Sequence, residues 1–171
     1  TAIRDVPKPV IARVQGFAIG GGNVLATICD LTICSDKAQF GQVGPKMGSV
    51  DPGYGTAFLA RVVGEKKARE IWYLNRRYSG AEAVAMGLAN FCFPHDQLDV
   101  EVQKIGEELC ERSPTALAIA KRSFNADTAH QAGIAGLGMY ALKLYYDTEE
   151  SREGVNALKD KRKPEFRKYA K

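Results

Sequence analysis

Three consecutive glycines, Gly20, Gly21 and Gly22, form the pattern in this chain that points most directly to chemistry. They follow a β-branched stretch at residues 9–15 and precede a run with helical spacing of its apolar residues at 23–29. The first N–H groups of a helix have no acceptor within the helix and carry the positive end of its dipole. Glycine also lets a ligand carbonyl approach the main chain closely. The pattern therefore predicts a strand, a glycine turn and a helix start that bind an oxygen which becomes negative during reaction. The alternative is a tight turn that needs positive φ.

A loop rich in glycine and proline at residues 43–55 carries two further candidates. Asp51, in a largely apolar segment, is either a turn residue or a base whose pKa rises through desolvation. The hydroxyl of Ser49 is either a donor that orients a substrate oxygen or an ordinary turn serine. Tyr146, near the end of a predicted helix, either places a phenol in a pocket or lies at the edge of the core. Trp72 lies on an apolar helical stripe and is predicted to be core.

Motifs for several other chemistries are absent from the sequence. A dinucleotide fingerprint that began at Gly20 would need glycine where Leu25 stands, and a P-loop would need lysine where Tyr54 stands. The two histidines lie far apart, and the four cysteines form no C-x-x-C pair, so neither a zinc site nor a histidine-activated nucleophile is predicted. We interpret the cysteines as reduced residues of a cytoplasmic protein.

The composition indicates one globular unit. The chain has 171 residues, of which 45% are hydrophobic, and a net charge of +4. Its basic residues gather toward the C-terminus, where they form either a solvated tail or a landing surface for a phosphate-bearing ligand. No aromatic stripe accompanies them, so no nucleic-acid partner is expected. No apolar run reaches the ~18 residues of a membrane span, so no membrane partner is expected either. The chain begins without Met on residues that look like a last helical turn, and we expect an N-terminal part to be missing.

The elements that must position these residues change character along the chain. We predict strands and connecting helices for residues 1–96 and helices alone for residues 97–171, and we treat these as two parts. The expected strands span residues 9–15, 31–34, 39–42 and 88–93. The expected helices span residues 23–29, 56–63, 65–74, 81–86, 98–111, 114–125, 131–146 and 149–161.

Four segments together resemble the crotonase (enoyl-CoA hydratase) superfamily: residues 15–22, 29–33 and 40–42, and Gly64. The resemblance covers essentially the whole chain. It implies an α/β fold, a spiral of ββα units followed by a helical module that trimerises, giving a homotrimer or a dimer of trimers. It implies a coenzyme A thioester as substrate, with no other cofactor required. The thioester oxygen would lie between two N–H groups, one at Gly21 between Gly20 and Gly22. The other belongs to the N-terminal part of the family pattern, so this chain supplies half of that oxyanion hole.

The sequence departs from the hydratases of this superfamily at the two positions that carry their catalytic glutamates. By motif these positions are Val24 and Gly44 here. Neither residue can accept or donate a proton. Hydration or dehydration is therefore not expected, even though the resemblance to the fold holds.

Residues 41–55, 66–73 and 161–166 narrow the resemblance to two branches of the superfamily. They are similar to the 1,4-dihydroxy-2-naphthoyl-CoA synthases and, more closely, to the 2-ketocyclohexanecarboxyl-CoA hydrolases of anaerobic benzoate degradation. This resemblance implies that Asp51 and Ser49 are catalytic and that Tyr146 reaches the substrate. The expected reaction is hydrolytic opening of 2-oxocyclohexane-1-carboxyl-CoA to pimeloyl-CoA. The alternatives are intramolecular Claisen condensation of o-succinylbenzoyl-CoA and a non-catalytic acyl-CoA-binding subunit.

Some of the synthases hold a bicarbonate ion that acts as base. The resemblance places Gln42, Gly44 and Trp72 at the positions that bind it. Position 43 is a threonine in those enzymes and is Val43 here, which removes one hydroxyl from that site. The substitution favours the hydrolase over a bicarbonate-dependent synthase.

Overall fold

The computed structural model describes residues 2–170, and its short strands form two three-stranded sheets. In the first sheet all neighbours are parallel, and its order is β1 (Ile11–Val14), β3 (Leu31–Ser35), β6 (Phe91–Phe93). In the second sheet, β2 (Phe17–Ile19) pairs parallel with β4 (Gln39–Gly41), which pairs antiparallel with β5 (Tyr78–Ser79).

The first four strands alternate between the two sheets, which gives this part of the chain a spiral path. β1 ends at Val14, the chain turns at Gln15 and Gly16, and β2 then starts in the second sheet. Helix α2 (Gly21–Ile28) leads back to β3 in the first sheet. The strand expected at residues 9–15 corresponds to β1, but the sequence prediction missed β2, so two strands in different sheets precede the glycine turn and not one. The turn that closes β1 includes Gly16, which the hydrophobic pattern alone does not distinguish from an extended residue.

The core lies between the sheets and the helices that connect them. Ile33 of β3, Phe40 of β4 and Leu59 are fully buried there. The connecting helices are α3 (Ala57–Val63), α4 (Glu65–Leu74) and α5 (Gly80–Ala85). Ser79 caps α5 in a capping box, in which its hydroxyl accepts from the Glu82 N–H while the Glu82 carboxylate accepts from the Ser79 N–H.

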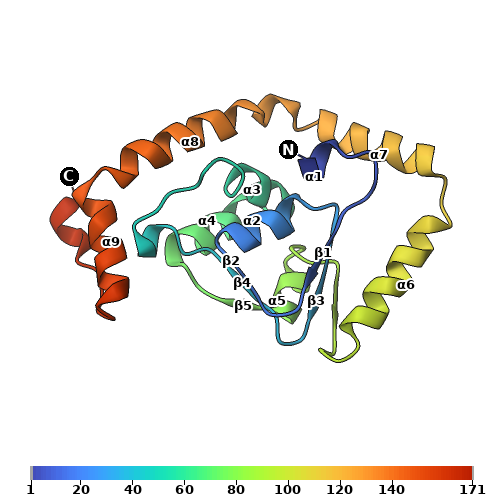
Figure 1. The fold of residues 1–171 in the computed structure, drawn as a ribbon, viewed down its shortest axis with the longest axis horizontal. Coiled ribbons are helices and arrows are strands. Elements are labelled where there is room, and N and C mark those ends of the chain that lie inside the picture. Colours follow the sequence, from blue (N-terminus) through green and yellow to red (C-terminus); the bar gives the residue numbers. More distant parts are fainter. Residues whose placement is uncertain (1, 171) are drawn as a thin grey trace.

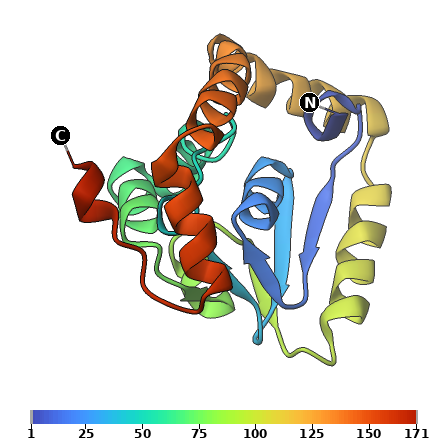
Figure 2. The same cartoon turned by 60° about the vertical axis from the view of Figure 1, so that its left-hand side comes forward.

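Four longer helices form an arch around the outside of this core (Figure 1): α6 (Leu98–Cys110), α7 (Pro114–Ala126), α8 (Gly133–Tyr146) and α9 (Glu149–Lys159). The same arrangement is seen from a second side (Figure 2), where α6 and α9 stand on opposite flanks. Ser113 and Thr148 are the N-caps of α7 and α9, as their hydroxyls accept from the N–H groups three residues later. Short turns complete the described chain: α1 (Ala2–Asp5) and 3₁₀ turns at Pro45–Met47, Ala129–Gln131 and Phe166–Tyr169.

One buried lysine fastens the arch to the start of the chain. Lys121 of α7 is 6% exposed, and its ammonium donates to Ile3 O at 2.7 Å, Lys8 O at 2.8 Å and Asp30 Oδ2 at 2.7 Å. Three acceptors match the three N–H groups of the ammonium, so the buried charge is fully hydrogen-bonded. Within residues 2–170 no helix is both long and apolar enough to cross a bilayer.

Candidate active site

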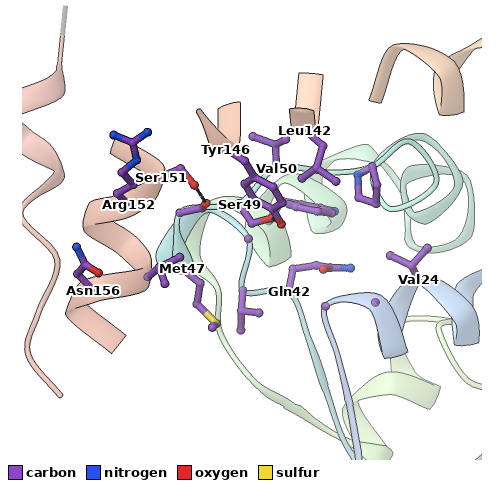
Figure 3. A pocket seen from close by; sticks show the side chains of 18 of the residues that line it. Val24, Gln42, Met47, Ser49, Val50, Leu142, Tyr146, Ser151, Arg152 and Asn156 are labelled. Atoms are coloured by element: carbon purple, nitrogen blue, oxygen red, sulfur yellow. Dashed lines mark hydrogen bonds between the residues drawn. The ribbon is translucent and has the colours of Figure 1, made fainter. Parts of the chain in front are cut away.

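A cavity of about 950 Å³ lies where the start of α2, the loop after β4 and the helices α8 and α9 meet. Figure 3 shows this cavity with Val24 and Gln42 on the core side and Tyr146 and Ser151 on the side of the arch. The lining is mostly apolar, as in many small-molecule sites. Its residues are Gly20, Gly21, Val24, Leu25, Gln42, Val43, Gly44, Met47, Gly48, Ser49, Val50, Pro52, Trp72, Leu142, Tyr146, Ser151, Arg152, Val155, Asn156 and Lys159.

The glycine turn presents one main-chain donor to this cavity. Gly20 is the N-cap of α2, with φ 58° and ψ −118°, a conformation that favours glycine. Its own N–H donates to Gly41 O at 2.9 Å. Gly21 is the first helical residue, so its N–H has no intrahelical acceptor, and a Cβ built on Gly21 meets nothing within 4 Å. Gly22 is exposed and lines a separate groove beside Phe17. Of the three predicted glycines, Gly20 shapes the turn and Gly21 is the donor that an oxygen can approach.

The positions of the hydratase glutamates are part of the cavity wall. Both Val24 and Gly44 line it, and no Asp or Glu occurs among its lining residues. A Cβ on Gly44 would lie 3.1 Å from Ser49 O and 3.2 Å from Trp72 Cζ3, so a larger side chain would need the loop to move. Among the described residues, the cavity wall therefore has no carboxylate at either position.

Two residues that are 97 positions apart meet at the other side of the cavity. The hydroxyl oxygens of Ser49 and Tyr146 lie 3.0 Å apart, within hydrogen-bond distance, and either can be the donor. Ser49 comes from the loop after β4, and Tyr146 is the last residue of α8. Tyr146 lies directly over Ser49 in Figure 3. The structure thus brings together two of the predicted catalytic residues.

Asp51 does not line this cavity. Its Oδ1 accepts from the N–H groups of Gly53 (2.9 Å) and Gly55 (2.8 Å). Its Oδ2 accepts from the N–H and the hydroxyl of Thr56, both at 2.7 Å. A carboxylate has about four lone-pair sites, and all four are occupied by the residues that lead into α3. These four hydrogen bonds order the turn before α3, and Asp51 borders a neighbouring cavity of about 440 Å³ that shares Ser49, Val50 and Trp72 with the first.

The side chains matched to a bicarbonate site differ in whether they are already hydrogen-bonded within the protein. The Trp72 indole N–H donates to Gly55 O at 2.6 Å and is therefore already used within the protein. Gln42 is 2% exposed, and its Nε2 has no hydrogen-bond partner among residues 2–170. Val43 adds no hydroxyl to the lining. Among the matched side chains, the Gln42 amide is thus the donor without a partner in residues 2–170, and the reaction proposed below uses no bicarbonate.

The sequence reasoning missed the contribution of α9 to this site. Arg152, Asn156 and Lys159 recur at spacings of four and three, which places them on one face of the helix, and all three line the cavity. Within the described chain, neither Arg152 nor Lys159 forms an ion pair with an Asp or Glu. The cavity therefore carries positive charge and no negative side chain. The same 3.6-residue periodicity could have indicated this face.

Metal chemistry finds no support in the described part of the chain. No group of three or more His, Cys, Asp or Glu side chains in residues 2–170 is arranged to hold a metal ion.

The two-sheet spiral, the helical arch and the cavity at the glycine turn define a class of protein, and comparisons with known proteins agree on it. The family model described as enoyl-CoA hydratase/isomerase matches residues 1–169. The chain belongs to this family, the crotonase superfamily, and has its α/β fold with parallel sheets and C-terminal helices. It is a crotonase-family acyl-CoA enzyme.

Several solved structures are similar to this chain. An enoyl-CoA hydratase from Mycobacterium avium subsp. paratuberculosis is 32% identical, with a TM-score of 0.91, over 96% of this chain and 68% of that one. A carnitinyl-CoA hydratase from Mycobacterium avium is 26% identical, with a TM-score of 0.86, over 93% and 62%. A methylmalonyl CoA decarboxylase is 26% identical, with a TM-score of 0.82, over 96% and 65%. The chain thus spans about two thirds of the length of these structures.

Proposed function

We propose that this protein cleaves a carbon–carbon bond in a cyclic β-keto acyl-CoA thioester by hydrolysis, with 2-oxocyclohexane-1-carboxyl-CoA as substrate and pimeloyl-CoA as product. The observation that carries the proposal is the Ser49–Tyr146 hydroxyl pair, 3.0 Å apart, at the wall of a cavity that also contains the Gly21 turn. Hydroxyl groups can transfer or orient a proton where the hydratase carboxylates are replaced by Val24 and Gly44. Fold and family membership alone do not distinguish this reaction from others of the superfamily.

The proposed reaction begins with attack of water on the ring ketone carbon. The bond between that carbon and the α-carbon then breaks, and its electron pair moves onto the α-carbon to give the thioester enolate. The Gly21 N–H donates to the enolate oxygen, where the negative charge develops. Tyr146 protonates the α-carbon and is hydrogen-bonded to Ser49. The former ketone carbon leaves as a carboxylic acid that keeps one proton of the water, and the proton removed from the water replaces the one that Tyr146 gave up.

We assign the activation of water to Asp51, with Ser49 between it and the main cavity. Ser49 lines both this cavity and the one that Asp51 borders. All four acceptor sites of the carboxylate are occupied, so one donor must leave before it can accept a proton from water. The Thr56 hydroxyl is the only one of the four that can turn away without moving the main chain.

Direct assay tests the proposal. Purified protein is incubated with 2-oxocyclohexane-1-carboxyl-CoA, o-succinylbenzoyl-CoA and crotonyl-CoA in separate reactions, and products are followed by mass spectrometry. We expect pimeloyl-CoA from the first and no hydration of the third. Turnover of o-succinylbenzoyl-CoA alone would establish the synthase instead. Tight binding of the thioesters without turnover of any would establish an acyl-CoA-binding subunit.

A pair of substitutions tests the role of Asp51. Asp51→Asn replaces an acceptor by an amide and is expected to reduce turnover about 10²- to 10⁴-fold, the usual contribution of a general base. Thr56→Val removes one donor to Oδ2 and is expected to keep or raise turnover, because it frees a lone pair. Equal losses in the two variants would mean that the carboxylate only orders the loop.

The assembly is a separate proposal. Large apolar side chains of the arch are exposed, among them Phe124 (76%), Leu137 (70%) and Leu144 (70%). Contiguous exposed apolar surface is typical of protein–protein contacts. We propose that copies of the chain cover this surface in a homotrimer or a dimer of trimers. Light scattering of the protein and of Leu137→Ser/Leu144→Ser tests it, and a monomeric mass for the unsubstituted protein would contradict it.

A further inference from the structure

The helices α8 and α9 contact the loop that carries Ser49 through their main chains. A Cβ built on Gly138 of α8 would lie 2.4 Å from Pro52 C and 2.5 Å from Gly53 N. A Cβ built on Gly154 of α9 would lie 2.4 Å from Gly48 N. Ordinary van der Waals contact begins at 3.4 Å. Only glycine therefore permits the observed approach of either helix to the loop.

The loop side of both contacts is also glycine. A Cβ on Gly48 (φ 70°) would lie 2.3 Å from Ser151 O, and one on Gly53 (φ 122°) would lie 2.4 Å from Ala135 Cα. Ser151 adds a hydrogen bond from its hydroxyl to Gly48 O at 2.7 Å. Two glycine–glycine contacts, Gly48 with Gly154 and Gly53 with Gly138, thus hold the loop against the arch.

In the sequence of the loop and in that of the arch, one of these contacts comes before the residue of the hydroxyl pair and the other comes after it. Ser49 follows Gly48 and precedes Gly53 in the loop. In the arch, Tyr146 lies eight residues after Gly138 and eight residues before Gly154. A shift of the main chain at either contact therefore changes the separation of the Ser49 and Tyr146 oxygens, which is 3.0 Å.

We propose that Gly138 and Gly154 are positioning residues that set the distance between the Ser49 and Tyr146 hydroxyls by allowing main-chain contact between arch and loop. The effect of these two glycines on catalysis rests on the proposed function, in which Tyr146 protonates the α-carbon. A methyl group at either position must push the two segments apart by about 1 Å, the difference between 3.4 and 2.4 Å. Misplacement of a reacting group by 1 Å can cost about 10²-fold in rate.

The first test uses Gly138→Ala and Gly154→Ala, with Gly136→Ala as the matched control. Gly136 is in the same helix as Gly138, and a Cβ there meets nothing within 4 Å. We expect kcat to fall about 10²-fold in the first two variants with KM changed much less, and neither to change in the control. In a Tyr146→Phe background the same glycine substitutions should have little further effect on kcat, because they act through Tyr146. If the glycine substitutions lowered kcat by the same factor in the Tyr146→Phe background as in the unsubstituted protein, the proposal would be overturned.

The second test needs no substrate. Amide hydrogen exchange of residues 47–53 is compared among the same variants, and we expect faster exchange in Gly138→Ala and Gly154→Ala only. Ser151→Ala, which adds no volume, loses the bond to Gly48 O and should give a smaller change in the same direction even if the alanine variants fail to fold. Unchanged exchange in Ser151→Ala and the alanine variants would refute the positioning role. Faster exchange in a protein that turns over none of the thioesters would support the positioning and refute the proposed function.

Discussion

The sheet core and the helical arch hold their residues in different ways. The core buries side chains, and Ile33, Phe40, Leu59 and Ile71 are all 0% exposed. In the arch, the buried residue of α7 is Lys121 and that of α8 is Gly138. The core is therefore held by apolar packing, whereas α7 is held by polar contacts, among them those of the Lys121 ammonium and the Asn125 amide, and α8 by close main-chain contact.

Because of this difference, two parts of the candidate site are positioned in different ways. The Gly21 donor belongs to α2, whose Asn23, Ala26 and Thr27 are buried, so the core alone fixes it. The Ser49–Tyr146 pair exists only where loop and arch meet. We therefore expect the oxyanion donor to survive changes that loosen the arch, and the hydroxyl pair to be lost with them.

The largest expected effect concerns the core. Phe40→Ala should lower the free energy of unfolding by about 3–5 kcal/mol, because a large side chain leaves a cavity in a packed interior. Phe17→Ala is the matched control on the paired strand β2, where Phe17 is 77% exposed and stacks against the Arg77 guanidinium. Its loss should stay below about 1 kcal/mol. Urea denaturation measures both, and equal losses would contradict the assignment of stability to the core.

The next effect concerns the hydroxyl pair. Tyr146→Phe removes the phenol oxygen and should reduce turnover about 10²-fold with thioester binding nearly unchanged. Tyr140→Phe in the same helix is the control, since Tyr140 is 75% exposed and does not line the cavity. Steady-state kinetics separate kcat from KM. A Tyr146→Phe variant that loses only affinity would assign Tyr146 to binding and not to proton transfer.

A third effect tests how the arch is attached. Lys121→Met keeps the apolar stem but leaves the carbonyl oxygens of Ile3 and Lys8 without this donor, and Asp30 Oδ2 keeps only the Val10 N–H. We expect a loss of about 2 kcal/mol in unfolding free energy, in the range for hydrogen bonds to a charged group. Lys143→Met, on the exposed side of α8, is expected to be neutral. Hydrogen exchange should show the loss in α7 and α1 before the sheets, and uniform loss would mean that arch and core unfold together.

The sequence predicted the elements better than it predicted their contacts. Helical periodicity placed α6, α7 and α9 to within two residues at each end, since spacing and the caps Ser113 and Thr148 are local signals. The change of sheet between β1 and β2 depends on pairing with β3 and β4, which are distant in sequence. Periodicity within a segment carries no record of such pairing.

The same limit applies to the site. The turn geometry of Asp51 was available from sequence as an aspartate followed by Gly53, Gly55 and Thr56, which are typical partners of a turn carboxylate. The meeting of Ser49 with Tyr146 was suggested only by resemblance, because 97 residues separate them. The contacts of Gly138 and Gly154 lack any side chain to mark them, so the sequence shows only two glycines in two helices.

The smallest expected effect concerns the end of the arch at low pH. The Glu153 carboxylate accepts from the Arg162 guanidinium at 2.6 and 3.0 Å and from the Glu165 N–H at 2.8 Å. The Arg162 hydrogen bonds, followed by the one from Glu165, lower the pKa of Glu153 from 4.5 to about 2. Because the folded pKa is the lower one, this contribution to stability is complete above pH 4.5 and is lost as the pH falls toward 2. Glu153→Gln removes the titrating group, so we expect its unfolding free energy to depend less steeply on pH between 4.5 and 2 than that of the unsubstituted protein. Identical slopes would show that the stability of α9 does not depend on this ion pair.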